Sequence, residues 1–255
     1  MIAIALQSGS NGNCLYVESG SVKLLFDAGI SGLQAQRRLE ALGRDIRDVQ
    51  AVILSHDHSD HVRCAGVFHR KFGLPVLATE KTLAAARRRA PLGELGDVAS
   101  FRAGQTLRFG AVSVETLPTP HDGVDGVAFV VDSGRARLGI LTDLGHVFDA
   151  LGEAVASLDA AFLESNYDPR MLETGPYPLF LQQRIRGPGG HISNYESAEL
   201  LARRASGRMK WACLAHLSEQ NNEPALARQT HETILRGKLP LHVASRYHPT
   251  GPLEL

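Results

Sequence analysis

The feature that most constrains this chain is a dense polar cluster directly after a short apolar run. Residues 51–54 read AVIL, a run typical of a buried β-strand, and the next residues read SHDHSDH. His56, His58 and His61, together with Asp60, therefore crowd a turn at the end of that strand. Each buried polar group needs a partner, and a divalent metal ion satisfies several of them together. A solvated polar turn is the alternative that this motif alone leaves open.

Three further candidate ligands also come after predicted strands. They are His121, Asp143 and His216, which come after the strands predicted at 112–117, 136–141 and 209–215. Each one alone is a weak signal, because a single histidine at a strand end is more often a surface or capping residue. Their shared placement favours one metal site, in which a carboxylate at Asp143 is suited to bridge two cations.

The rest of the chain repeats one pattern twice, several strands followed by helices with interspersed strands. Strands are predicted at 2–6, 14–18, 22–27, 51–54, 75–78, 106–109, 112–117, 127–131, 136–141, 160–163, 209–215 and 241–244, and helices at 33–42, 62–72, 81–89, 147–156, 195–205 and 224–236. Two sheets packed face to face with helices outside satisfy this pattern. No linker or charge block divides the chain, so we expect a single α/β domain over residues 1–255 that ends in a Pro/Gly tail.

Charge balance removes the simplest argument for a nucleic-acid partner. The chain has 27 basic and 27 acidic side chains, so no global positive field attracts phosphates. Any such contact has to come from local basic clusters. These are Arg87 to Arg89, the pair Arg184 and Arg186, and the group Arg203, Arg204, Arg208 and Lys210. Each cluster is equally typical of a solvated helix face, so both interpretations stay open.

Cysteine usage and hydropathy bear on the compartment. Cys14, Cys64 and Cys213 form no CxxC pair and are odd in number, which favours a reducing environment. The N-terminal segment lacks the regions of a signal peptide, and no stretch approaches the roughly 20 apolar residues that span a bilayer. We therefore expect a cytoplasmic protein with no membrane segment. We interpret Cys213, near His216, as a buried strand residue rather than a thiolate ligand.

Taken in order, the segments HDHSDH, TPHD, TDLG and AHLSEQNN resemble the metal-binding motifs of the metallo-β-lactamase-fold hydrolases. The segments SGSNGNCLYVE, LFDAG, ESNYD and GGHISN are more similar to the YycJ/WalJ-type branch, which is nuclease-like and cytoplasmic. The resemblance extends from Ser8 to about Asn222. It implies a four-layer αββα sandwich with mixed sheets and a site at the edge between them.

The resemblance also implies a ligand set for two divalent metal ions. One ion is assigned to His56, His58 and His121, the other to Asp60, His61 and His216, with Asp143 as the bridge. A set made only of nitrogen and oxygen atoms suits zinc and equally admits manganese. Two such ions hold a shared hydroxide at neutral pH, which Asp60 is placed to orient.

A second catalytic candidate is His191, which is similar to an assisting histidine in a GHST segment of the ribonuclease Z group. It precedes a predicted helix that Ser193 or Asn194 caps, with Glu196 supporting the first turn. A helix N-terminus beside a histidine suits a phosphate group, so Ser193 and Asn194 are candidate substrate-binding residues. The alternative is that His191 only contacts backbone in a glycine-rich loop. Ser10 and Asn11, in the SGSNGN loop, are further substrate-binding candidates, although such residues also simply make turns.

These residues favour a dinuclear-metal phosphodiesterase, and the resemblance implies a DNA or RNA exonuclease. The alternative enzyme hydrolyses a small ester, thioester or lactone with the same hydroxide. A metal-stabilised scaffold is disfavoured because no ligand position is degraded. Between Asp143 and His216 no β-CASP-type domain is inserted, and no long exosite arm of the ribonuclease Z kind is present, which argues against transfer-RNA processing. The oligomeric state stays open.

Overall fold

The computed structural model describes all 255 residues, and the chain forms fourteen strands and nine α-helices. The strands are β1 (Ile2–Gln7), β2 (Cys14–Ser19), β3 (Val22–Phe26), β4 (Ala51–Ile53), β5 (Val76–Thr79), β6 (Val98–Phe101), β7 (Thr106–Phe109), β8 (Val112–Pro118), β9 (Val127–Asp132), β10 (Arg137–Leu141), β11 (Ala160–Glu164), β12 (Trp211–Ala215), β13 (Leu241–Val243) and β14 (Leu253–Glu254). The helices are α1 (Gly32–Glu40), α2 (Ser59–Val62), α3 (Ala65–Phe72), α4 (Glu80–Arg89), α5 (Asp149–Ser157), α6 (Pro169–Thr174), α7 (Leu179–Arg186), α8 (Asn194–Arg204) and α9 (Pro224–Leu235).

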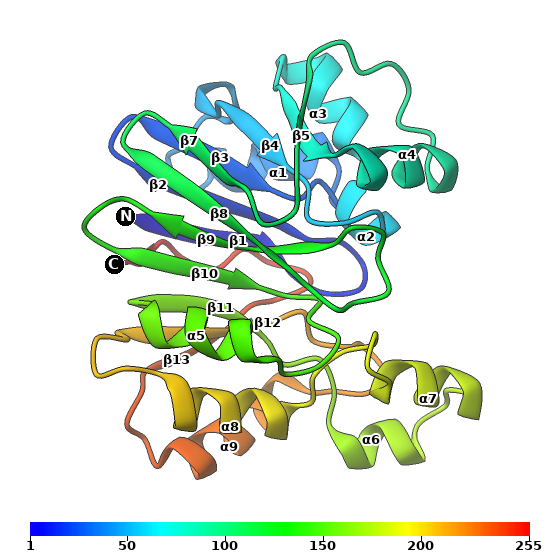
Figure 1. Ribbon diagram of the computed structural model, residues 1–255, viewed down its shortest axis with the longest axis vertical. Helices are drawn as coiled ribbons and strands as arrows, with labels where there is room; N and C mark the ends of the chain where they lie inside the picture. The colour runs from blue at the N-terminus through cyan, green and yellow to red at the C-terminus, as the bar shows by residue number, and fades with distance from the viewer.

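Two seven-stranded sheets form the middle of the molecule. The first has the order β14-β1-β2-β3-β4-β5-β6 and the second the order β13-β12-β11-β10-β9-β8-β7. Figure 1 shows α1, α3 and α4 on the outside of the first sheet and α5, α8 and α9 on the outside of the second. The four-layer αββα sandwich expected from the sequence is therefore confirmed.

Both sheets are mixed, as expected, and the direction of their strands prepares the site. Strands β3 to β6 run parallel in the first sheet, and β10 to β13 run parallel in the second. Strand β8 shares the direction of β10, because both pair antiparallel with β9. Strands that run in the same direction end at the same edge of a sheet, so the segments that follow β8, β10, β11 and β12 all begin at one edge of the second sheet.

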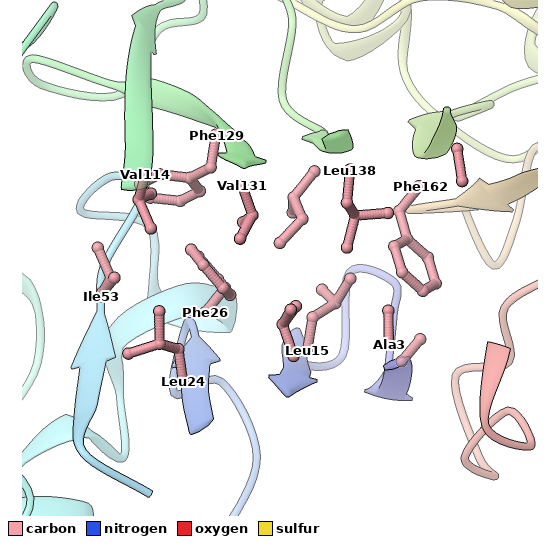
Figure 2. Packing of buried hydrophobic residues seen from close by; sticks show 14 of the residues in the cluster. Ala3, Leu15, Leu24, Phe26, Ile53, Val114, Phe129, Val131, Leu138 and Phe162 are labelled. Carbon is pink, nitrogen blue, oxygen red and sulfur yellow. The ribbon is translucent and has the colours of Figure 1, made fainter. Parts of the chain in front are cut away.

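The main core lies between the sheets and contains 24 buried hydrophobic residues. Phe26 of the first sheet meets Phe129 of the second with ring centroids 5.0 Å apart, and Figure 2 shows the two inner faces meeting there. In β8 the residues Val112 and Val114 are buried while their neighbours are more exposed, the alternation of a strand with one buried face. Truncating a buried aromatic of this kind costs about 3–5 kcal/mol of stability, so this layer contributes strongly to holding the two sheets together.

One predicted helix is shorter than expected. The prediction of one helix over 62–72 was wrong at its start, because Val62 ends the separate short helix α2, residues 63 and 64 form a turn, and α3 begins only at Ala65. Between them the N–H of Cys64 donates to the carbonyl of Ala28, 2.9 Å away, instead of continuing a helical ladder. This tertiary contact therefore interrupts the single helix that the apolar periodicity predicted.

Five elements were not predicted from the sequence. They are β6, α2, α6, α7 and β14. The expected Pro/Gly tail ends in β14, where Leu253 pairs with Ala3 at the edge of the first sheet. Helix α6 carried a readable signal, because Asp168 caps it and Pro169 occupies its first turn.

None of the helices combines the length and the apolar character that crossing a bilayer requires. The three cysteines are free. Cys213 lies fully buried in β12, which confirms its interpretation as a strand residue, and burial raises the pKa of its thiol.

Candidate metal centre

The ends of four strands bring the predicted metal ligands to one edge of the sandwich, at the end where Figure 1 draws α2. Strand β4 is followed by His56, His58, Asp60 and His61, β8 by His121, β10 by Asp143 and β12 by His216. Their side chains form overlapping groups whose ligand atoms lie within 4.8 Å of one another. The structure thus brings together all seven residues, although their assignment to individual ions stays a prediction.

Asp143 lies between the two predicted ligand groups. Its Oδ1 is 3.7 Å from His121 Nε2 and 3.5 Å from His216 Nδ1, and its Oδ2 is 3.3 Å from His61 Nε2. On one side His121 Nε2 lies 3.2 Å from His58 Nδ1, and on the other Asp60 Oδ2 lies 3.4 Å from His61 Nε2. This is the position that a bridging carboxylate requires.

Strained backbone accompanies the cluster. Asp27, Asp143 and His216 each come after a strand at this edge and have φ angles of 63°, 59° and 55°. Few residues other than glycine adopt this left-handed conformation, and Asp and His do so more often than most. Such strain persists where surrounding structure imposes it, commonly at functional sites.

Neighbouring acceptors orient the imidazole rings. The Nδ1–H of His121 donates to the carbonyl of Gly190 at 2.8 Å, and Nδ1 of His61 lies 2.7 Å from Asp27 Oδ2. Nδ1 of His56 faces the hydroxyl of Ser55 at 2.9 Å, and that hydroxyl in turn donates to Asp27. In all three rings this leaves Nε2 as the ligand atom, as in many metal sites where a second group fixes the ring.

The residues fit a bound metal on two observations. His56 Nε2 and Asp143 Oδ2 are buried and have no hydrogen-bond partner, which is costly for a polar atom unless something else binds it. The ligand set is also rich in imidazole and carboxylate groups, which suit zinc and other first-row ions. A divalent cation among these atoms satisfies both orphaned atoms.

Burial is the largest influence on the pKa values of these histidines, and the neighbouring charges decide whether each pKa falls or rises. Burial, helped by His121, lowers the pKa of His58 to about 4. Burial also disfavours a charge on His216, but Asp143 and the carboxylates beside it outweigh burial and raise the pKa of His216 to about 10. The same balance raises the pKa of His61 well above its usual range. Protons on His61 and His216 compensate the buried carboxylates, and a bound cation would replace them.

Glu164, the last residue of β11, is a site residue that the sequence analysis missed. It is fully buried, and its carboxylate lies 2.7 Å from His191 Nδ1 and 3.2 Å from His216 Nδ1. It also accepts hydrogen bonds from the backbone N–H groups of Asp143, Leu144 and Ile192. Burial opposes its charge, but His191 outweighs burial and the pKa of Glu164 is lowered. Its place at a strand end, like that of Asp143, was the signal that could have found it.

Asp27 and Asn13 are further residues of the site that were not predicted. Asp27 orients His61 and accepts the N–H of Ser55 at 2.8 Å. The side-chain amide of Asn13 lies 3.2 Å from Asp60 Oδ2 and 3.0 Å from His61 Nε2. Asp27 lies in the LFDAG strand end and Asn13 in the glycine-rich loop, which the sequence analysis singled out without assigning them a role.

His191 sits at the edge of the cluster, with its side chain about one-fifth exposed and its ring 4.9 Å from that of His121. It lies just before α8, which Ser193 caps in a capping box with Glu196, as predicted. Because Nδ1 faces Glu164, Nε2 is the free nitrogen of His191. Because the His191 side chain contacts the Glu164 carboxylate, the alternative that His191 touches only backbone is wrong.

The predicted substrate-binding residues occupy different environments. Ser10 is exposed, while Asn11 is partly buried and its amide donates to the carbonyl of Arg246. Ser193 and Asn194 are both buried. The Asn194 side chain accepts a hydrogen bond from Ser165 at 2.6 Å and exchanges others with Asn222, so it braces the start of α8. A role in substrate binding stays a prediction for all four.

The basic clusters separate in space. Arg89 and Arg184 line the mouth of the site, around a hollow of about 360 Å³ that they share with His58, Ser59 and Asp60. Arg208 and Lys210 precede β12 and therefore lie at the opposite edge of the sheet, where Arg208 pairs with Asp159. Only part of the basic sequence pattern is thus near the site.

A four-layer αββα sandwich with a His/Asp cluster at the shared edge of its sheets defines a metal-dependent hydrolase. The chain belongs to the β-lactamase superfamily, since residues 23–212 match the Beta-lactamase superfamily domain.

Two curated relatives match almost the whole chain. It is 34% identical over 250 residues to the exodeoxyribonuclease WalJ of Streptococcus pneumoniae serotype 2, covering 97% of this chain and 93% of that protein. It is also 34% identical over 248 residues to the exodeoxyribonuclease YycJ of Bacillus anthracis, covering 97% and 94%. Among solved structures, the metallo-beta-lactamase fold protein YhfI from Bacillus subtilis matches with a TM-score of 0.75 and 16% identity over 98% of each chain. The expected family and fold are confirmed.

Proposed function

We propose that this protein is a metal-dependent exonuclease that hydrolyses the phosphodiester bonds of DNA, with RNA as the second candidate polymer. The observation that carries the proposal is the 34% identity to two exodeoxyribonucleases over 97% of the chain. The cluster of seven ligands and the arginines at its mouth support it, because phosphodiester cleavage needs both charge stabilisation and phosphate binding.

The proposed cofactors are two divalent cations, zinc or manganese. His56, His58 and His121 would hold one, and Asp60, His61 and His216 the other, with Asp143 shared. When bound, such ions polarise a phosphate group and activate water at neutral pH. The orphaned atoms His56 Nε2 and Asp143 Oδ2 are the support that this chain offers for them.

The protein's own groups divide the remaining work. Asp60 faces the hollow with its side chain about one-fifth exposed, where its carboxylate accepts a hydrogen bond from the attacking water and orients it. Glu164 holds the Nδ1–H of His191, so His191 Nε2 can donate a proton to the departing oxygen. The buried Glu164 carboxylate also fixes the orientation of the His191 ring.

The proposed location is the cytoplasm, and the proposed partner is the nucleic-acid substrate. The support for the location is the set of three free cysteines, two of them fully buried, which need no oxidising compartment.

The test measures nucleotide release from end-labelled oligonucleotides by protein stripped of metal and reloaded with Mn²⁺ or Zn²⁺. Single-stranded and double-stranded DNA, and RNA of the same sequence, are each labelled at the 5′ or the 3′ end. We expect stepwise release of mononucleotides that a chelator abolishes and added metal restores. Hydrolysis of a small ester, thioester or lactone by the metal-loaded protein, with no nucleotide release, would contradict the proposal in favour of the alternative enzyme.

A further inference from the structure

Two arginines flank the mouth of the metal centre although neither belongs to a metal motif. Arg89 is the last residue of α4, and Arg184 lies in α7, 95 positions further along the chain (184 − 89). They come together around the hollow that also exposes His58, Ser59 and Asp60. Chain segments that are distant in sequence therefore place two positive charges beside the predicted ligands.

Arg89 is held by an ion pair with a buried aspartate. Its Nε lies 2.7 Å from Oδ2 of Asp57, whose side chain is fully buried. Asp57 is fixed in turn, since its Oδ1 accepts a hydrogen bond from the backbone N–H of Val124 at 2.6 Å. The Arg89 side chain is 48% exposed and lines the hollow at the mouth.

Arg184 is held by an ion pair that is also a hydrogen bond. Its Nε donates to Oδ2 of Asp122 at 2.7 Å, and the side chain is 57% exposed. Oδ1 of Asp122 points back to the site, 3.3 Å from His58 Nε2. Each arginine is thus held by an aspartate that is adjacent in sequence to a predicted ligand.

Two other arginines, Arg137 and Arg208, use their side chains differently. Arg137 directs both terminal nitrogens to the carboxylate of Glu115, at 3.0 and 3.1 Å, and Arg208 binds Asp159 through Nε and a terminal nitrogen. Those forks are filled by protein carboxylates. In Arg89 and Arg184 no protein group bonds the terminal nitrogens, so both forks remain available.

We propose that Arg89 and Arg184 form a clamp for the backbone phosphate next to the one that is cleaved. A guanidinium fork matches the geometry of a phosphate and binds it through two parallel hydrogen bonds. The clamp selects a strand with consecutive phosphates over an isolated diester, and so specifies a polyanionic substrate. This inference rests on the proposed nuclease function and adds to it the residues that recognise the polymer.

The test compares Arg89→Gln, Arg184→Gln and the double variant on two substrates, an end-labelled single-stranded oligonucleotide and bis(4-nitrophenyl) phosphate, which has no neighbouring phosphate. We expect kcat/KM on the oligonucleotide to fall about tenfold per substitution, with a change of less than about twofold on the small diester. The slope of log(kcat/KM) against log[salt] should become shallower by about 0.7 per arginine. Arg135→Gln, at an exposed arginine between β9 and β10 and therefore at the opposite edge of the sheet, is the control and should change neither slope nor rate.

Metal content and oligonucleotide binding separate the outcomes. Equal losses on both substrates together with reduced metal content would overturn the clamp, because the arginines would then only support the ligand loops. Unchanged oligonucleotide cleavage in the double variant would also overturn it. If the wild-type protein cleaves no nucleic acid, fluorescence anisotropy of the labelled strand decides: arginine-dependent binding supports the clamp while the proposed function fails. Absence of binding would refute both.

Discussion

Asp143 meets two demands that few residue types satisfy together. Its carboxylate is buried among imidazoles, which outweigh burial and hold its pKa well below the usual range, so the group is ionised. Its backbone has a φ of 59°, which disfavours most side chains with a Cβ. Asparagine shares the shape and tolerates this backbone, but it lacks the charge. Asp143→Asn is therefore a cleaner test of the bridge than alanine.

We expect Asp143→Asn to lower the metal content below two ions per chain and to reduce nuclease activity by roughly a hundredfold or more, because the shared ligand loses its charge. Elemental analysis and nucleotide release measure the two effects. Asp125→Asn makes the same change at another left-handed aspartate, which pairs with Lys81, and should preserve both properties. Full occupancy of both ions in Asp143→Asn would refute the bridging role.

His191 is predicted to act outside the metal ligand set. His191→Gln should leave metal content unchanged and slow phosphodiester cleavage by about 10²–10⁴-fold, the usual contribution of a general acid. Rates at saturating metal, with elemental analysis of the same samples, measure this. His146→Gln, at an exposed histidine whose Nδ1 bonds the carbonyl of Pro188, is the control. A marked loss of metal in His191→Gln would instead make His191 a ligand.

At the scale of elements, the loops after β1 and after β3 fix the short helix α2 that carries Asp60 and His61. The backbone N–H of Ala28 donates to the carbonyl of His61 at 2.6 Å, and the N–H of Asn13 donates to that of Asp60 at 2.8 Å. Gly29 packs against the same turn so closely that a Cβ there would lie 1.6 Å from the carbonyl oxygen of Asp60. Glycine is needed for this approach of two backbones, and not for an unusual φ.

Gly29→Ala should therefore displace α2 and the ligands on it. We expect a loss of about 3 kcal/mol in the free energy of unfolding, in the range of overpacked cores, and weaker metal binding. Urea unfolding and metal titration measure these. Gly207→Ala is the control, because a Cβ at Gly207 meets nothing within 4 Å. Unchanged metal affinity in Gly29→Ala would show that α2 is positioned independently of this loop.

At the scale of the whole molecule, the packing of α8 on α9 links stability to pH. His231 of α9 is buried between them, with Nδ1 2.8 Å from the carbonyl of Ala227 and Nε2 3.2 Å from the hydroxyl of Ser197. Burial lowers the pKa of His231 to about 4. In the unfolded chain a histidine titrates near 6.5, so the unfolded state binds more protons between about pH 4 and 6.5. The contribution of His231 is complete above that window and is lost as the pH falls through it.

This linkage predicts a difference between wild type and His231→Gln. Lowering the pH from 7.5 to 5.0 should cost the wild type about 2 kcal/mol more unfolding free energy than the variant, because glutamine does not titrate. Urea unfolding of chelator-treated proteins at both pH values measures it. Because the histidines of the metal centre are common to both proteins, their contribution cancels in the difference. Equal losses in the two proteins would show that burial does not lower the pKa of His231.

Local sequence patterns were enough to predict most of the strands and helices of this protein. Alternating and apolar runs indicated twelve of the strands and six of the helices, since periodicity depends only on chain neighbours. The residues directly after the strands brought His121, Asp143 and His216 into one proposed site with the HxHxDH turn. Strand β14 and helix α7 could not be predicted in this way. Strand β14 has only two residues and α7 has no buried side chain, so neither carries much periodicity.

Only the tertiary structure decided which groups act on those ligands. Glu164 meets His191 across 27 positions and Asp27 meets His61 across 34, and no local pattern encodes either distance. The tertiary structure also separated the basic clusters, placing Arg184 against Asp122 at the site and Arg208 at the far edge. The physical reason is that a residue's chemistry and local conformation depend on its own chain segment, whereas its electrostatic partners are chosen by how the sheets pack.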